Sequence, residues 1–268
     1  MLNFKSTSIL FIIAMSLIGL LYYFFVISLW WFVLPIVVYK SFIIYGSATI
    51  QSDFFLKAYC SSNTTEKKIA ITFDDGPHRT FTPQILSVLA EQNVPATFFV
   101  IGKNIQGNES IIKQINETGN VIGNHTFSHS FFIDLKTIPA FTYELDITSD
   151  AVYNITGKRI KLFRPPYGVT TPNIAKAVKE LNYYTIGWNI RSMDTTRDST
   201  EVISKRVKNQ VKPGAIILFH DTSEKTVEVL KQTLNFAKEN GFKIVSIEEL
   251  LGISVYQKNV IARNEAIS

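Results

Sequence analysis

The feature that most constrains this chain is a long stretch without charge near its amino terminus. No charged side chain occurs from Ser6 to Tyr39, and the first acidic residue is Asp53. A secretory signal has a hydrophobic core of only about 7–15 residues, so this stretch is too long to be one. Residues 1–52 are therefore predicted to be a membrane anchor, and roughly 200 residues remain for one folded domain.

Two arrangements of the anchor fit its length. Two short transmembrane helices would cover about residues 9–26 and 31–50, with only Lys40 interrupting the second. One long tilted helix over about residues 9–38 is the alternative, because a straight span needs about 20 residues. In a hairpin, the uncharged turn would be the non-cytoplasmic part, which by the positive-inside rule leaves the domain inside. The two arrangements place the domain on opposite sides, so its side stays open.

Charge and cysteine content exclude several classes of protein. Only Lys5 and Lys40 carry charge before Asp53, so 25 basic and 22 acidic residues remain, without a Lys/Arg run. This balance argues against a nucleic-acid partner. Cys60 is the single cysteine, which rules out an intrachain disulfide and a cysteine-based zinc site.

After a predicted linker over residues 53–67, short β-rich segments alternate with helical ones. The expected strands cover residues 68–73, 96–101, 121–124, 161–164, 183–188, 215–219 and 243–246. The expected helices cover residues 82–92, 109–118, 139–155, 171–181, 200–210 and 225–240, with Thr82-Pro83 and Thr171-Pro172 as helix starts. Seven β-rich segments separated by helices predict a parallel α/β fold, either barrel-like or doubly wound. No glycine-rich phosphate loop is present to support a nucleotide-binding fold.

Unusual polar residues follow several of the expected strands. These segments are Asp74-Asp75-Gly76-Pro77, His125-Thr126-Phe127-Ser128-His129, Arg164-Pro165-Pro166-Tyr167-Gly168, Asp194 and Leu218-Phe219-His220-Asp221. Each segment alone could be a turn or an exposed loop. In parallel α/β folds, however, ligands bind at the carboxyl ends of the strands, so together they predict one shared site.

The residue types suit metal-assisted hydrolysis. One carboxylate and two neutral imidazoles make a three-ligand divalent metal site with room for water, as in catalytic zinc sites. Of two adjacent aspartates only one can easily face the metal, which leaves the other to take a proton from water. A more distant histidine can then protonate the leaving group. The sequence therefore predicts hydrolysis with a separate base and acid.

These segments resemble the motifs of the polysaccharide deacetylases of carbohydrate esterase family 4, which share the NodB homology domain. The resemblance covers about Lys67 to Leu251. It rests on Thr72-Phe73-Asp74-Asp75-Gly76-Pro77, His125-Thr126-Phe127-Ser128-His129, Arg164-Pro165-Pro166-Tyr167 and Leu218-Phe219-His220. It implies a distorted, incomplete (β/α) barrel of about seven parallel strands over residues 68–251, followed by a tail over 252–268. The implied activity is hydrolysis of N-acetyl groups on amino sugars of peptidoglycan, a chitin-like polymer or an exopolysaccharide.

The resemblance also implies which residues act on the attacking water. Asp74 looks like the catalytic base. Asp75, His125 and His129 look like the ligands of one divalent metal ion, with zinc the expected metal.

The remaining roles follow from the same resemblance. Arg164 would hold Asp74, and the backbone N–H of Tyr167 would help to stabilise the oxyanion. His220 would be the general acid, with Asp194 keeping it protonated. This chain departs from the family pattern after Asp194, where a tryptophan is usual and Thr195 stands here; the nearest indole is Trp188. Asp198 is therefore a competing partner for His220.

Other readings of the sequence lead to different partners. A deformylase or deacetylase of a lipid-linked sugar would suit the membrane anchor. A carbohydrate-binding domain without turnover is less favoured, because ligands and base are all present. We expect a bacterial cell-membrane protein that contacts lipid through its membrane anchor. Its catalytic domain is expected to face the exterior or periplasm, although the side is open, and the sequence does not set the oligomeric state.

Overall fold

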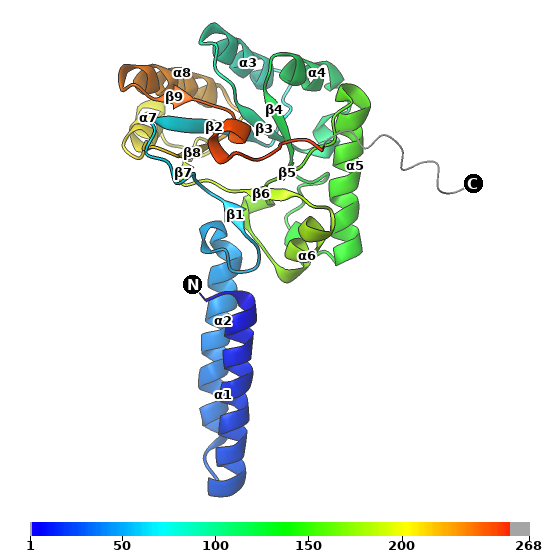
Figure 1. Cartoon of the computed structure of the whole chain (residues 1–268), viewed down its shortest axis with the longest axis vertical. Helices are drawn as coiled ribbons and strands as arrows, with labels where there is room; N and C mark the ends of the chain where they lie inside the picture. Colours follow the sequence, from blue (N-terminus) through cyan, green and yellow to red (C-terminus); the bar gives the residue numbers. More distant parts are fainter. Residues whose placement is uncertain (1, 258–268) are drawn as a thin grey trace, which may run out of the picture.

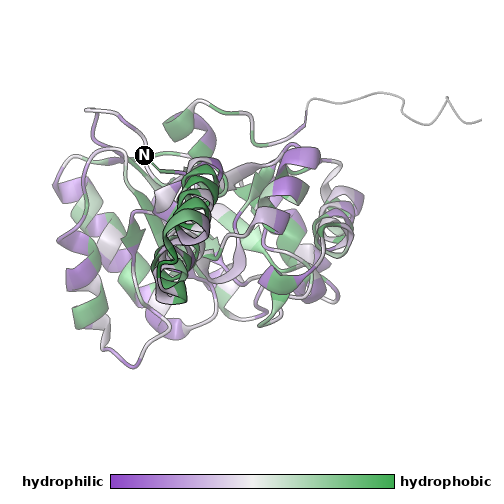
Figure 2. Ribbon diagram, turned by 90° about the horizontal axis from the view of Figure 1, so that it is seen from below, coloured by the Kyte–Doolittle hydropathy of each residue, from purple (hydrophilic) through white to green (hydrophobic). Residues whose placement is uncertain are grey.

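The computed structural model, which describes residues 2–257, consists of an α/β domain and a helical hairpin projecting from it (Figure 1). Helix α1 (Phe4–Phe25) and helix α2 (Val33–Ala48) are joined through the short 3₁₀ helix η1 (Leu29–Phe32). They pack side by side, with the rings of Phe11 and Tyr39 stacked 4.4 Å apart. Both arms are long and apolar enough to cross a membrane, and their apolar character is visible in Figure 2. Of the two predicted arrangements, the structure has the hairpin.

The domain is built on a nine-stranded sheet in which all strand pairs are parallel. Its strands are β1 (Ala58–Tyr59), β2 (Lys68–Asp74), β3 (Thr97–Val100), β4 (Val121–Asn124), β5 (Leu162–Phe163), β6 (Tyr184–Ile186), β7 (Ile190–Arg191), β8 (Ile216–His220) and β9 (Lys243–Ile244). The strand order is β1-β6-β5-β4-β3-β2-β8-β7, with β9 also paired to β2. The seven predicted strands are all present, and the structure adds β1 and β7, of two residues each, which the sequence did not predict.

The sheet curls because its two distant ends belong to one bent stretch of chain. β6 and β7 are separated only by residues 187–189. Within this stretch, Gly187 N–H donates to Tyr59 O and Asn189 N–H donates to Ile216 O. The bend therefore connects β5 and β6 at one end of the sheet to β7 and β8 at the other. This confirms the predicted distorted barrel.

Helices surround the sheet; all but the last, a five-residue helix, lie at the positions expected from the sequence. They are α3 (Phe81–Glu91), α4 (Glu109–Glu117), α5 (Ile138–Thr156), α6 (Pro172–Glu180), α7 (Thr200–Lys208), α8 (Glu224–Glu239) and α9 (Ile247–Leu251). Thr171 caps α6 as predicted, since its side chain accepts from Ile174 N–H. The predicted cap at Thr82 is wrong: this residue lies inside α3, where its hydroxyl donates to Asp221 instead.

Alternation along the strands separates two buried layers. On β2, Ile69, Ile71 and Phe73 pack outward against the helices in the larger core cluster. Ala70 faces the interior of the barrel, together with Leu218 of β8. Because side chains alternate along a strand, the interior set continues to the carboxyl ends of the strands, where the polar motifs begin.

Residues 53–67, predicted as a linker, are packed against the domain in the structure. Phe54 is buried, and β1 pairs with β6. Further along, Ser62 N–H donates to Gly214 O at 2.8 Å. The polar composition of residues 61–67 suggested a free connection, whereas Leu56, Tyr59 and Cys60 before them pack against the interior core cluster. Of the predicted tail, residues 258–268 lie outside the described part of the chain.

Substitution of Gly214 tests the packing of residues 61–62 against the domain. It has φ +77°, and an added Cβ would lie 2.0 Å from Ser62 O, whereas Gly119 has φ +78° with open space around it. We expect Gly119→Ala to lower the free energy of unfolding by about 1–2 kcal/mol, the usual cost of left-handed backbone. Gly214→Ala should cost about 1–3 kcal/mol more because of the overlap. Equal costs in denaturant titrations would show that residues 61–62 do not pack here.

Candidate active site

The polar motifs meet at the carboxyl edge of the sheet. Asp74 and His220 end β2 and β8 and are direct partners in the register of the two strands. His125 and Arg164 each follow the last residue of a neighbouring strand, and Arg164 N–H donates to Asn124 O at 3.0 Å. Strand alternation therefore directs their side chains into the same end of the barrel.

Arg164 is completely buried and holds Asp74 in place. Its guanidinium donates to Asp74 Oδ1 at 2.8 Å and lies 4.1 Å from the centre of the Phe99 ring. The other donors go to Thr72 Oγ1, Ile186 O and Gly187 O. Burial raises the pKa of Asp74 above its ordinary value, although Arg164 and His220 act in the opposite direction. A group with a raised pKa is better suited to accept a proton than an exposed aspartate.

Asp75, His125 and His129 bring their ligand atoms together beside Asp74. One ligand atom from each lies within 4.8 Å of the other two. Asp75 Oδ1 is 3.6 Å from His125 Nε2 and 3.4 Å from His129 Nε2. A carboxylate with two imidazoles at this spacing is a donor set suited to a divalent metal ion.

The hydrogen bonding of His125 fits metal ligation. Its Nδ1 lies 2.8 Å from Arg164 O, and a carbonyl can only accept, so the proton is on Nδ1. Nε2 therefore presents a lone pair to Asp75 and His129, the arrangement usual for a metal-binding histidine. Burial lowers the pKa of His125 to about 3, which keeps the ring neutral near pH 7.

The loop carrying His125 and His129 is held by Glu144, which the sequence analysis did not single out. This buried carboxylate of α5 accepts from the N–H groups of Phe127 and Ser128 and from the Ser128 hydroxyl. Burial opposes ionisation, but Lys136 and the Ser128 donors together keep the pKa of Glu144 below its usual range. Glu144 therefore acts on the site by positioning its loop. Its sequence signal is weak, because the buried face of α5 also carries the polar residues Thr148 and Ser149.

Asp194 and His220 form a hydrogen-bonded pair. Asp194 Oδ1 is 2.8 Å from His220 Nδ1, and Asp194 Oδ2 accepts from His220 N–H at 2.8 Å and from Thr226 Oγ1 at 2.7 Å. Burial disfavours the imidazolium, but the hydrogen bond and charge of Asp194 outweigh it, so the pKa of His220 is raised. Asp198, the competing candidate, is paired with Arg206 instead.

Tyr167 lies next to His129, in a strained turn. It has φ +59°, and Gly168 has φ +72°. The Tyr167 ring packs edge-on against His129, with centroids 4.8 Å apart. Trp188 lies behind this turn, 5.6 Å from the Arg164 guanidinium, and its ring would be 2.7 Å from a Cβ at Gly168. The tryptophan that the family pattern places after Asp194 has no counterpart there; here the indole supports the turn.

Two further titratable residues that follow strands, His78 and Asp221, make hydrogen bonds that stabilise the local fold. His78 Nδ1 accepts from the N–H groups of Thr80 and Phe81 at the start of α3, apart from the other histidines. Asp221 is buried next to the site, where its N–H donates to Asp74 O and its carboxyl accepts from Thr82. Burial raises the pKa of Asp221 to about 7.

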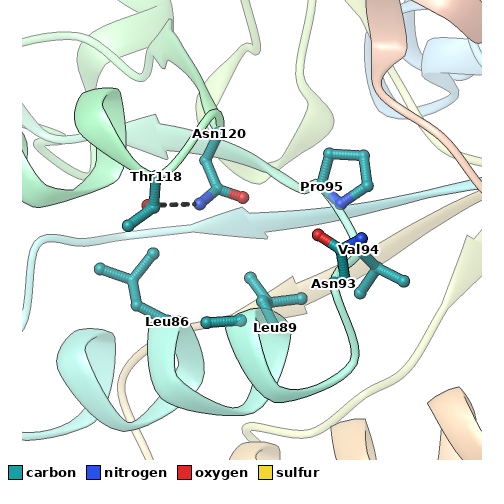
Figure 3. A pocket seen from close by; sticks show the side chains of 8 residues that line it. Leu86, Leu89, Asn93, Val94, Pro95, Thr118 and Asn120 are labelled. Carbon is teal, nitrogen blue, oxygen red and sulfur yellow. Dashed lines mark hydrogen bonds between the residues drawn. The ribbon is translucent and has the colours of Figure 1, made fainter.

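A separate pocket lies at the other edge of the sheet (Figure 3). Its lining includes Leu86 and Leu89 of α3 together with Pro95, Thr118 and Asn120. The last three lie just before the strands β3 and β4 begin, at the amino ends of the strands. Asn120 is engaged with Thr118 Oγ1 and Ala96 N–H, and the lining contains no acid, base or metal ligand. This pocket is therefore not a candidate for the chemistry.

The family model of polysaccharide deacetylase matches residues 61–186. The peptidoglycan-N-acetylmuramic acid deacetylase PdaA of Bacillus subtilis (strain 168) is 35% identical over 198 residues, which is 72% of this chain and 75% of the relative. The chain belongs to the polysaccharide deacetylase family. Members of this family hydrolyse N-acetyl amide bonds of polysaccharides. The family model's match ends at residue 186, before Asp194 and His220.

Solved structures share the deacetylase fold. A crystal structure of a peptidoglycan N-acetylglucosamine deacetylase aligns with a TM-score of 0.71 and 31% identity, covering 74% of this chain and 94% of that one. A family 4 pseudoenzyme from Bacillus anthracis aligns with a TM-score of 0.67 and 27% identity, covering 71% of this chain and 67% of that one. Because the fold occurs with and without activity, function has to be argued from the site.

The hydrogen bond between Asp194 and His220 leads to a specific prediction about how activity depends on pH. A general acid works only while protonated, so activity should fall as pH rises through the pKa of His220. Asp194→Asn removes the charge that raises this pKa, so the basic limb of the kcat profile should move to lower pH. Asp198→Asn is the matched control and should leave the limb in place. The reverse result would identify Asp198 as the partner of His220.

Proposed function

We propose that this protein is a membrane-anchored, metal-dependent N-deacetylase of amino sugars in peptidoglycan. The observation that carries the proposal is the cluster of Asp75, His125 and His129, whose ligand atoms lie within 4.8 Å of one another. Asp74 lies against it with Oδ2 3.8 Å from His125 Nε2, and His220 is beside Asp74 in the strand register. A metal donor set with a base and an acid at hand supports hydrolysis of an amide.

The residues on one side of the cluster would act on the attacking water. A divalent ion held by Asp75, His125 and His129 would supply Lewis acidity toward the amide carbonyl and a lower pKa for water. Asp74 would take the proton of that water on the carboxylate oxygen that Arg164 does not bind. Arg164 would keep Asp74 from turning away, because both side chains are buried and directly bonded.

Tyr167, His220 and Asp194 would handle the developing charge and the leaving group. The N–H of Tyr167 would donate to the carbonyl oxygen as it gains negative charge. Protonated His220 would give its proton to the sugar nitrogen as the carbon–nitrogen bond breaks. Asp194 would keep His220 both oriented and charged through their 2.8 Å hydrogen bond.

The relatives support peptidoglycan as the substrate class. One acts on N-acetylmuramic acid and another on N-acetylglucosamine by their names. Both sugars present the same N-acetyl group, so the cluster fits either. The names refer to the polymer and give no support to the lipid-linked sugar considered from the sequence. Acetate release from defined N-acetylglucosamine and N-acetylmuramic acid units would identify the sugar.

The hairpin supports a location at a bacterial cell membrane. With two spans, the amino terminus and the catalytic domain lie on the same side (Figure 1). We place both on the outer side, where peptidoglycan is. The positive-inside rule alone favours the opposite side, since Lys5 and Lys57 flank the two helices and the turn between them carries no charge. We give more weight to the location of the polymer.

Metal content tests the cluster directly. His125→Ala and His129→Ala should each remove most of the metal from the purified full-length protein, because a two-ligand site binds divalent ions weakly. His78→Ala is the matched control, since this histidine caps α3, and it should keep about one ion per chain. Elemental analysis should find zinc as the principal metal. Full occupancy in both ligand variants would exclude the proposed site.

Substitutions can distinguish the catalytic base, Asp74, from the metal ligand Asp75. Asp74→Asn preserves size and should retain the metal while kcat for acetate release falls by about 10²-fold or more, the usual scale of general base catalysis. Asp75→Asn should instead lower metal content. If the Asp74 variant loses metal and the Asp75 variant keeps it, the roles of the two aspartates are exchanged.

A further inference from the structure

The base of the hairpin contacts the catalytic edge of the domain through several hydrogen bonds. This base comprises residues 46–52, the last turn of α2 and the 3₁₀ helix η2 (Ile50–Ser52) that follows it. Thr170 N–H donates to Ser47 O at 3.1 Å, and the Thr170 hydroxyl donates to Gly46 O at 3.3 Å. Gln51 Nε2 donates to Trp188 O at 2.9 Å. A simple membrane tether would need none of these contacts.

Both segments held in this way support groups of the proposed site. Thr170 is three residues after Tyr167 and belongs to the same loop, residues 165–170. Trp188 packs behind Gly168 of this loop and beside the Arg164 guanidinium. The hairpin base therefore contacts the Tyr167 loop directly through Thr170, and it contacts Trp188, which supports this loop.

The loop needs such support because part of its backbone is strained. Tyr167 has φ +59°, a left-handed conformation that is unfavourable for a non-glycine residue. Surrounding contacts have to hold the residue in this state. Thr170 is buried, and its N–H and hydroxyl both end on carbonyls at the carboxyl end of α2. These carbonyls lack partners within a helix, so they are free to accept from the loop.

We propose that the last turn of α2 is a positioning element of the active site, which holds the Tyr167 loop and couples the membrane hairpin to catalysis. The inference rests on the proposed function for its catalytic consequence, whereas the contact itself is independent of the reaction. Displacement of α2 would release Thr170, relax Tyr167 and move its N–H away from the carbonyl oxygen of the substrate.

Gly46 offers a way to displace α2 by a small change. It is buried, and a Cβ added there would lie 2.2 Å from the ring of buried Phe54, so helix and ring cannot both stay in place. Gly19 is the matched control, because it is also a helical glycine of the hairpin and has open space around it. Both substitutions raise helix propensity equally, so any difference between them reports the contact.

The experiment compares full-length Gly46→Ala and Gly19→Ala in detergent micelles. Hydrogen exchange of peptides covering residues 165–171 should be about tenfold faster in Gly46→Ala, as expected for loss of one backbone hydrogen bond. The kcat for acetate release from N-acetylglucosamine oligomers should fall about tenfold, with KM within about twofold and metal content unchanged. Gly19→Ala should match the unsubstituted protein in every measurement.

A second substitution distinguishes positioning from general damage. Phe54→Gly removes the Cβ, Cγ and Cδ1 atoms that the new methyl group would meet. Adding Gly46→Ala to Phe54→Gly should therefore cause no further rise in exchange and no further fall in kcat relative to Phe54→Gly alone. If Gly46→Ala does not fold, Thr170→Val, which lacks the hydroxyl donor, should speed exchange of the same peptides. Thr170→Ser, which keeps the hydroxyl donor, should stay close to the unsubstituted protein.

Several results would overturn the inference. Equal exchange and equal kcat in the Gly46 and Gly19 variants would show that the hairpin only anchors the domain. A further loss when Gly46→Ala is added to Phe54→Gly would exclude the contact with Phe54 as the cause. An unsubstituted protein that holds metal but releases no acetate would refute the proposed function. The exchange measurement would then still decide whether α2 positions the loop.

Discussion

The catalytic edge of this protein depends on one buried guanidinium. Arg164 follows β5, binds Asp74 at the end of β2, and donates to the carbonyls of Ile186 and Gly187 where the bent strand closes the barrel. Burial of a charge is tolerated only when it is paired and its donors are satisfied, so these three parts of the chain must converge around it. Loss of either partner would leave a buried charge without compensation, a change that costs about 3–5 kcal/mol.

The chemistry of the site follows from where the strands end. Asp74, His125, Arg164 and His220 face the interior because each continues the inward alternation of its strand. Asp75 comes one residue later and would point outward, but its φ of +77° reverses the chain and turns the carboxylate back toward the histidines. Two adjacent aspartates can therefore face one cluster from different directions, which is what separate base and ligand roles require.

Much of this arrangement can be predicted from the sequence, because each polar motif directly follows a segment of strong β character. The features that could not be predicted also have physical explanations. The sequence alone did not separate Asp194 from Asp198, since both lie in the same loop and only the fold brings one of them to His220. Glu144 contacts the histidine loop from a helix more than a dozen residues away. Residues 53–62 look like a connection because their strand has only two residues and their burial depends on partners distant in sequence.

Anomalous diffraction from crystals grown with zinc would test the account most directly, because it locates the ion independently of activity. The account predicts one strong peak per chain at the zinc edge, about 2.0–2.2 Å from a carboxylate oxygen of Asp75 and from Nε2 of His125 and His129. Asp74 should remain bonded to Arg164 and outside ligand distance. A peak ligated by Asp74 instead of Asp75, or no peak among these residues, would contradict the assignment of base and ligands on which the proposed function rests.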